Sequence, residues 1–218
     1  MRWLMTLVAL VALAPAAQAQ GVLTFGEPGA PSATVTVDAA GNARVERDIG
    51  GLSIIVRDRE AYSIGDNGAV PWATVQRDRI AAYDAARPSL PASDLRFAKR
   101  AGGAETVNGI AGQLWRLTDR QGSELELVMS DDPRLAPFAP AMRAILAEAW
   151  LSLELRRQPG FMAAVEAILA RGTLVRLGSF AIRDLRLGPV DPARFRLPLC
   201  IVSGSDSLDP ARRRCTVA

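Results

Sequence analysis

Residues 112–129 read GQLWRLTDRQGSELELVM. Residues 124–127 alternate between polar and apolar, and in residues 114–117 Leu114 and Arg116 alternate with Trp115 and Leu117, which is the period of a β-strand with one buried face. Between the two runs lies a short polar segment with Gly122, and glycine is favoured in the tight turns that join antiparallel strands. The stretch therefore predicts a β-hairpin and makes an antiparallel sheet the organising element of the fold.

Strand signals continue on both sides of this hairpin. Four β-branched or alternating runs, divided by turn residues, predict an antiparallel meander at residues 34–37, 43–49, 52–56 and 60–64. Further strands are predicted at residues 95–100, 105–108, 173–177 and 180–187. In the last of these the apolar alternation shifts across Arg183 and Asp184, which predicts a β-bulge. Residues 20–32 are rich in glycine and proline, so we expect an irregular lead-in there.

Two helices are predicted between the hairpin and the last strands. The first has an apolar stripe at helical spacing, made of Phe138, Met142, Ile145, Leu146, Ala149 and Leu153. After a break at Pro159 and Gly160, the same spacing returns in Phe161, Val165, Ile168 and Leu169 and ends at Gly172. Residues 72–86 have only a loose helical spacing.

Strands, then helices, then strands, without βαβ alternation, predict an α+β fold. We expect a curved antiparallel sheet, an unclosed half-barrel, with the helical hairpin packed on its concave face. A single domain is predicted over residues 33–198, followed by a C-terminal segment at residues 199–218.

The N-terminus has the features of a secretory signal peptide. Arg2 precedes an apolar run that ends at Pro15, and Ala17 and Ala19 are the small residues that a signal peptidase reads. We predict that residues 1–19 are removed by cleavage after Ala19 and that the mature chain is periplasmic. In such an oxidising compartment, Cys200 and Cys215 are predicted to form a disulfide bond.

Composition excludes several classes of activity. The chain of 218 residues contains no histidine, which removes serine and cysteine nucleophiles paired with imidazole and also imidazole metal sites. Loss of Arg2 with the signal peptide leaves 25 basic residues against 23 acidic ones, a net charge of +2 that does not predict nucleic-acid binding. We therefore expect no catalytic residues, no metal and no cofactor.

A family resemblance points in the same direction. The segment TVNGIAG at residues 106–112, the strand after it, and residues 124–132 resemble the core of uncharacterised periplasmic families in the LolA-like (lipoprotein-carrier-like) superfamily. Residues 188–198, GPVDPARFRLP, are similar to the segment that ends such domains. The resemblance implies an unclosed β-barrel with helices as a lid over an apolar concavity that holds acyl chains.

The expected function is that of a periplasmic, non-enzymatic protein that binds an apolar ligand: an acyl chain, a lipid or a lipoprotein segment. Its candidate contact residues are Trp72, Trp115, Phe138, Met142 and Trp150, which also suit a filled core. One alternative is therefore an envelope structural or interaction protein without a ligand. A weaker alternative is a carboxylate-dependent hydrolase, although Glu124 and Glu126 are expected to face water. Contact with the membrane is expected to be peripheral at most, and the oligomeric state stays open.

Overall fold

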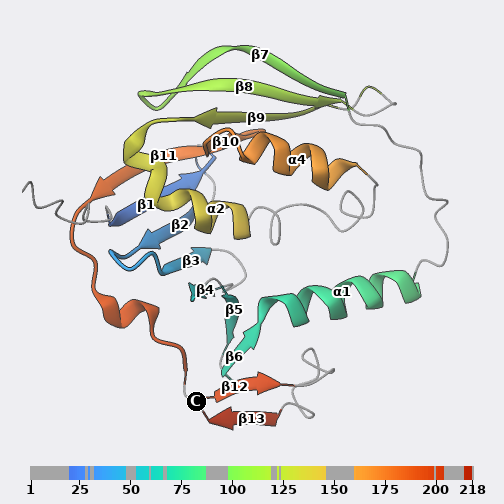
Figure 1. The fold of residues 1–218 in the computed structure, drawn as a ribbon, viewed down its shortest axis with the longest axis vertical. Coiled ribbons are helices and arrows are strands. Elements are labelled where there is room, and N and C mark those ends of the chain that lie inside the picture. The colour runs from blue at the N-terminus through green and yellow to red at the C-terminus, as the bar shows by residue number, and fades with distance from the viewer. Residues whose placement is uncertain are drawn as a thin grey trace, which may run out of the picture.

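One sheet organises the chain in the computed structural model (Figure 1). The structure describes residues 20–27, 29, 32–47, 53–58, 60–65, 68–86, 98–118, 122, 124–145, 160–198, 200–203 and 214–217. In these residues, 13 strands lie in the order β13-β12-β6-β5-β4-β3-β2-β1-β11-β10-β9-β8-β7. Neighbouring strands are antiparallel except β12 and β6, which make a parallel contact between Ile201 and Ala69. The sheet is not closed, because β7 and β13 form its two ends.

The strands occur in three groups along the chain. The first comprises β1 (Gly21–Gly26), β2 (Ser32–Val37), β3 (Ala43–Arg47), β4 (Ser53–Arg57), β5 (Glu60–Gly65) and β6 (Gly68–Pro71). The second comprises β7 (Ala98–Val107), β8 (Ile110–Thr118) and β9 (Glu124–Ser130). The third comprises β10 (Thr173–Leu177), β11 (Phe180–Leu187), β12 (Cys200–Ser203) and β13 (Arg214–Val217). The helices are α1 (Trp72–Ala86), η1 (Pro133–Phe138), α2 (Ala139–Ile145), α4 (Phe161–Leu169) and η3 (Pro192–Phe195).

The antiparallel hairpin expected around Gly122 is present, with Trp115 opposite Leu127 and Arg116 opposite Glu126. The predicted bulge is also confirmed. Thr24 of β1 lies opposite Asp184, whereas Phe25 lies opposite Ile182, so the register shifts at this point and β11 contains one extra residue. Residues 72–86, whose helical spacing is loose, form helix α1 throughout.

The expectation of an irregular lead-in at residues 20–32 is wrong. Residues 21–26 form β1, which pairs with β2 on one side and β11 on the other. Leu23 and Phe25 are fully buried while Val22 and Thr24 are only partly so, and this alternation is typical of a strand. The surrounding glycines and prolines obscured a short alternating run whose stability depends on its two neighbours in the sheet.

The strands expected at residues 95–100 and 105–108 are, over the described residues, parts of one strand. β7 continues through Gly102 and Gly103, where its register against β8 shifts between Ala101 and Ala104. A bulge accommodates these two residues without ending the strand. Turn-like glycines thus mark an irregularity within β7 rather than a break between two strands.

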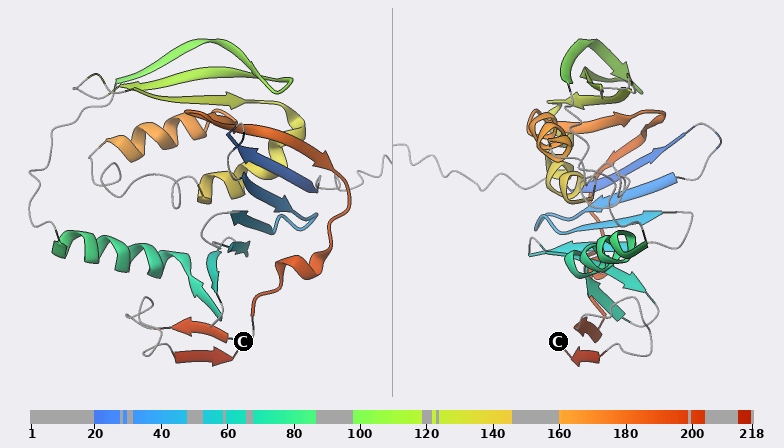
Figure 2. Two further views of the ribbon diagram at one scale, coloured as in Figure 1. Left: turned by 180° about the vertical axis from the view of Figure 1, so that it is seen from behind. Right: turned by 90° about the vertical axis from the view of Figure 1, so that its right-hand side faces the viewer.

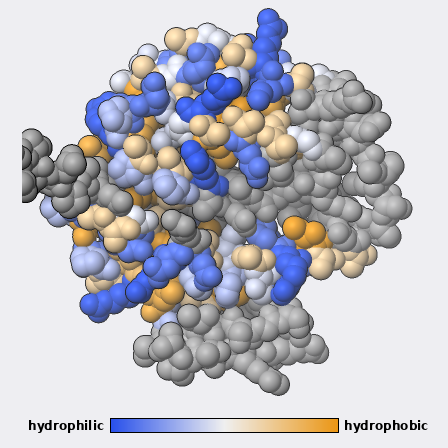
Figure 3. Space-filling model, viewed as in Figure 1, coloured by the Kyte–Doolittle hydropathy of each residue, from blue (hydrophilic) through white to orange (hydrophobic). Residues whose placement is uncertain are grey.

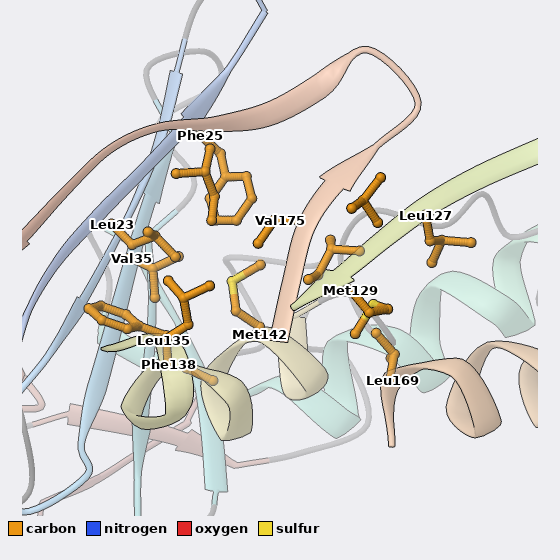
Figure 4. Close-up of a cluster of buried hydrophobic side chains, with 14 of the residues drawn as sticks. Leu23, Phe25, Val35, Leu127, Met129, Leu135, Phe138, Met142, Leu169 and Val175 are labelled. Carbon is orange, nitrogen blue, oxygen red and sulfur yellow. The ribbon is translucent and has the colours of Figure 1, made fainter. Parts of the chain in front are cut away.

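The apolar core lies between the sheet and the helices. Contacts of η1 and α2 with β2 and β10 place Leu135, Phe138 and Met142 over the sheet, and all three side chains are fully buried (Figure 4). Val165 and Ile168 of α4 are also buried. The right-hand view of Figure 2 shows α2 and α4 on the same side of the strands. The expected burial of the segments around Met142 and Val165 is therefore observed.

A complete helical hairpin on a concave face stays a prediction. Residues 146–159, with Trp150 and the second half of the first apolar stripe, lie outside the described residues, as does the signal peptide. The disulfide prediction also concerns side chains that the structure does not describe. The register of β12 and β13 places Cys200 opposite Val217 and Cys215 opposite Val202.

Candidate functional site

Three of the residues expected to contact an apolar ligand, Trp72, Phe138 and Met142, are buried in the core. Phe138 and Met142 are 0% and 1% exposed and pack between η1, α2 and the sheet. Trp72 is also buried, and it begins α1, a helix that contacts β5 and β6. Trp150 lies outside the described residues. Trp115 is half-buried and lines a pocket.

This pocket, which we call the Trp115 pocket, has a volume of about 520 Å³. It is lined by Ala101, Ala111, Gly112, Gln113, Trp115, Met129, Asp131 and Arg171. The sheet register explains how three strands meet there: Ala101 of β7 lies opposite Trp115 of β8, and Gln113 of β8 lies opposite Met129 of β9. Met129 is buried, whereas Gln113, Asp131 and Arg171 are exposed. The pocket therefore combines a buried apolar wall with a polar, accessible rim.

Arg171 follows α4 and reaches back over the pocket. Its guanidinium carbon lies 5.5 Å from the centre of the Trp115 ring, a cation–π contact worth about 0.5–1 kcal/mol at an exposed site. Its backbone N–H donates to the Ile168 carbonyl at 2.8 Å, which tightens the end of the helix. The next residue, Gly172, lies so close to Ser130 that an added Cβ would be 2.3 Å from the Ser130 carbonyl oxygen. These contacts hold Arg171 beside the end of β9.

Ser130, Asp131 and Asp132, at the end of β9 and directly after it, make different contacts. The hydroxyl of Ser130 donates to the Ala111 carbonyl at 2.6 Å. Asp132 caps η1 by accepting from the backbone N–H of Arg134, and the hydrogen bond from the Arg134 side chain lowers the pKa of this carboxyl. Asp131 lines the Trp115 pocket. In the described part of the chain, no group of three or more potential metal ligands occurs.

A network of ion pairs occupies the opposite face of the same strands. Arg176 of β10 donates to Glu105 at 2.8 and 2.9 Å and to Glu126 at 3.0 Å, and Arg116 donates to Glu126 at 2.9 Å. Strand alternation puts Arg116 and Glu126 on the face opposite Trp115 and Leu127. The hydrogen bonds from Arg116 and then Arg176 lower the pKa of Glu126. Glu126 is therefore an ionised partner of two arginines rather than one of two carboxyls that share a proton.

The outer surface gives no competing apolar site among the described residues. Leu187, at 47% exposure, is the one large hydrophobic residue there that is exposed. On the face in Figure 3, hydrophilic and hydrophobic residues are intermixed over the described part. No helix in the described ranges has the length and apolar character of a membrane span.

Comparison with known proteins gives no relative from which the function of the site could be inferred. No protein-family model, no curated protein and no solved structure matches this chain. The sequence patterns did not predict that Gln113 and Arg171 line a binding pocket. Arg171 directly precedes the glycine expected to end the second helix, and a charged residue at such a fixed position is the signal that was available.

Proposed function

We propose that the chain is a periplasmic, non-enzymatic binding protein for an apolar ligand: an acyl chain, a lipid or a lipoprotein segment. The observation that carries the proposal is the Trp115 pocket, whose volume of about 520 Å³ is in the range of small-molecule sites. Trp115 and Met129 offer the ligand an apolar surface, while Gln113, Asp131 and Arg171 surround it with polar groups. Such a division suits a molecule with an apolar chain and a polar end.

The fold supports this proposal through its architecture. An unclosed antiparallel sheet with helices packed on one face is the coarse architecture that a LolA-like resemblance implies, and we include membership of that superfamily in the proposal. A periplasmic location is compatible with the start of the sheet. The Gln20 carbonyl accepts a hydrogen bond from Gly188 at 3.0 Å and β1 begins at Gly21, so cleavage after Ala19 leaves β1 intact.

The compartment is tested by fractionation of cells followed by N-terminal sequencing. A mature chain that begins at Gln20 in the periplasmic fraction is the expected result, and a chain found uncleaved in the cytoplasm contradicts it. On the same sample, alkylation with and without prior reduction tests the disulfide. We expect Cys200 and Cys215 to react with the alkylating reagent only after reduction.

Ligand binding is tested with a matched pair of variants on one strand. Ala101 and Ala98 are both exposed on β7, but Ala101 lines the pocket, whereas Ala98 lies opposite Thr118, outside the pocket lining. We expect delipidated wild-type protein and Ala98→Phe to take up a fluorescent fatty acid. Ala101→Phe, which occupies part of the pocket, is expected to bind it at least tenfold more weakly. Equal uptake by both variants, or none by the wild type, would overturn the assignment of the pocket.

A second candidate function is an envelope interaction protein with a filled core. The observation that favours it is the complete burial of Leu135, Phe138 and Met142 in the core between the sheet and the helices η1 and α2. This candidate predicts a protein partner recovered by crosslinking in the cell envelope. It also predicts no additional mass in native mass spectra of protein purified from its own envelope, whereas the first proposal predicts a mass that organic solvent removes.

A further inference from the structure

Two opposite charges line the Trp115 pocket without neutralising each other. The guanidinium of Arg171 lies over the Trp115 ring, and Asp131, which follows β9, also lines the pocket. Within the described part of the chain, neither side chain has an ion-pair partner, because their N–O distances to any such partner exceed 4.0 Å. On the other face of the same strands, by contrast, Glu105 and Glu126 are both paired with arginine. The pocket thus presents one positive and one negative group together.

A close backbone contact brings the segments that carry these two charges together. Gly172 lies against the Ser130 carbonyl, and an added Cβ there would also be 3.5 Å from the backbone nitrogen of Asp131. Arg171 directly precedes Gly172, and Asp131 directly follows Ser130. The two charged side chains therefore extend from neighbouring points of the backbone.

We propose that the pocket recognises a zwitterionic head group on its apolar ligand, and this inference rests on the proposed function. A phosphate or carboxylate of the ligand pairs with Arg171, whose planar guanidinium can donate two parallel hydrogen bonds to such an anion. An ammonium group of the ligand donates to Asp131. The chain next to the head group lies against Trp115 and Met129.

Other head groups match the pocket less well. A purely anionic group pairs with Arg171 but is repelled by Asp131, and a purely cationic group meets the reverse arrangement. A neutral group leaves both charges without an ionic partner. A ligand with both signs of charge is the class that satisfies Arg171 and Asp131 at once.

Binding of four amphiphiles with the same acyl or alkyl chain tests the inference, using the delipidated full-length mature protein. The probes are a lysophosphatidylethanolamine, a lysophosphatidic acid, a monoacylglycerol and an alkylamine, and isothermal titration gives their dissociation constants. We expect the zwitterionic probe to bind about tenfold more tightly than each of the others, equivalent to one charged contact.

Charge variants at the two positions should exchange the preference. Asp131→Asn is expected to favour lysophosphatidic acid, Arg171→Gln to favour the alkylamine, and Arg171→Lys to retain the zwitterion in part. Arg143→Gln is the matched control, because Arg143 is an exposed arginine on α2 outside the pocket lining. Circular dichroism and thermal unfolding of each variant verify that it is folded.

The outcomes separate this inference from the proposed function. Equal affinity for all probes, with no effect of Asp131→Asn or Arg171→Gln, overturns the zwitterion inference and leaves apolar-ligand binding in place. Tightest binding of the purely anionic probe by the wild type overturns it in the same way. Failure of every amphiphile to bind overturns the proposed function and the inference with it.

Discussion

The side chain of Asn108, in the turn between β7 and β8, donates a hydrogen bond to the backbone carbonyl of Arg183 in β11. In the sheet, β9 and β10 lie between β8 and β11, so a flat sheet would separate these strands by about 14 Å. A short asparagine side chain spans that interval only if the sheet curls. Arg176 and Glu105, on β10 and β7, make a second contact across the same face. This end of the sheet therefore curls toward the face opposite Trp115 and α4.

Asn108 combines two roles, which substitutions can separate. Its φ of 48°, followed by a φ of 78° at Gly109, is typical of the two-residue turns that join antiparallel strands. Asn108→Gly keeps this turn but loses the hydrogen bond to Arg183, so we expect a loss of about 0.5–1.5 kcal/mol in the free energy of unfolding. Asn108→Ala also strains the turn, and its loss should be about 1 kcal/mol larger. Urea unfolding measures both; equal stabilities of Asn108→Gly and the wild type would contradict the role of the contact.

The ion pairs of Glu126 with two arginines predict that the stability of the fold depends on pH. Arg116 and Arg176 lower its pKa from the ordinary value of 4.5, so its charged form stabilises the folded state above the pKa of the unfolded chain. That contribution disappears as the pH falls through the lower pKa of the folded state. Glu126→Gln should therefore be less stable than wild type at pH 7, by at most about 1 kcal/mol, and the difference should shrink below about pH 4.

Urea unfolding at pH 7 and pH 3 measures this difference for Glu126→Gln. Glu124→Gln is the matched control on the same strand, because Glu124 lies 3.9 Å from Arg116 whereas Glu126 lies 2.9 Å from it. We expect a smaller effect for the control at pH 7. A difference for Glu126→Gln that is the same at both pH values would be inconsistent with ion pairing.

Gly172 is predicted to be intolerant of any side chain. A Cβ there would lie 2.3 Å from the backbone oxygen of Ser130, and a backbone atom cannot move aside as the end of a flexible side chain can. We expect Gly172→Ala to lose about 1–3 kcal/mol of stability and to weaken ligand binding by shifting Arg171 relative to Asp131. Gly65→Ala is the control, since nothing lies within 4 Å of its added Cβ. Thermal unfolding and fatty-acid uptake of both variants test this, and unchanged uptake by Gly172→Ala counts against the positioning of Arg171.

Substitution of Phe138 tests whether this residue is part of the core or contacts the ligand. It is fully buried and no part of the Trp115 pocket, so Phe138→Ala should lose about 3–5 kcal/mol of stability without changing the affinity for an apolar ligand. Arg143→Ala, an exposed neighbour on α2, should change stability by less than about 0.5 kcal/mol. The affinity of both variants for the fluorescent fatty acid, measured where both are folded, tests this expectation. A weakened affinity in Phe138→Ala would place the ligand beneath η1 and α2 instead.

The alternation of apolar residues predicted most of the strands and their antiparallel order, because each hairpin is a local event. It failed at β1, where glycine and proline on both sides hid the strand, and at β7, where Gly102 and Gly103 suggested a break. The same limit applied to the site. Apolar size alone proposed Trp72, Trp115, Phe138 and Met142, but large side chains are also what a core requires, and only packing distinguishes the two uses.

The amino-acid sequence by itself determined the local features: the antiparallel hairpins, the bulge in β11, the apolar faces of the helices around Met142 and Val165, and the absence of histidine chemistry. Each depends on residues that are close along the chain. The tertiary structure alone decided that Arg171 and Asp131 share one pocket and that Asn108 reaches Arg183. Those neighbours are 40 and 75 residues apart, and the curl of the sheet and the contact of Gly172 with Ser130, rather than any local pattern, bring them together.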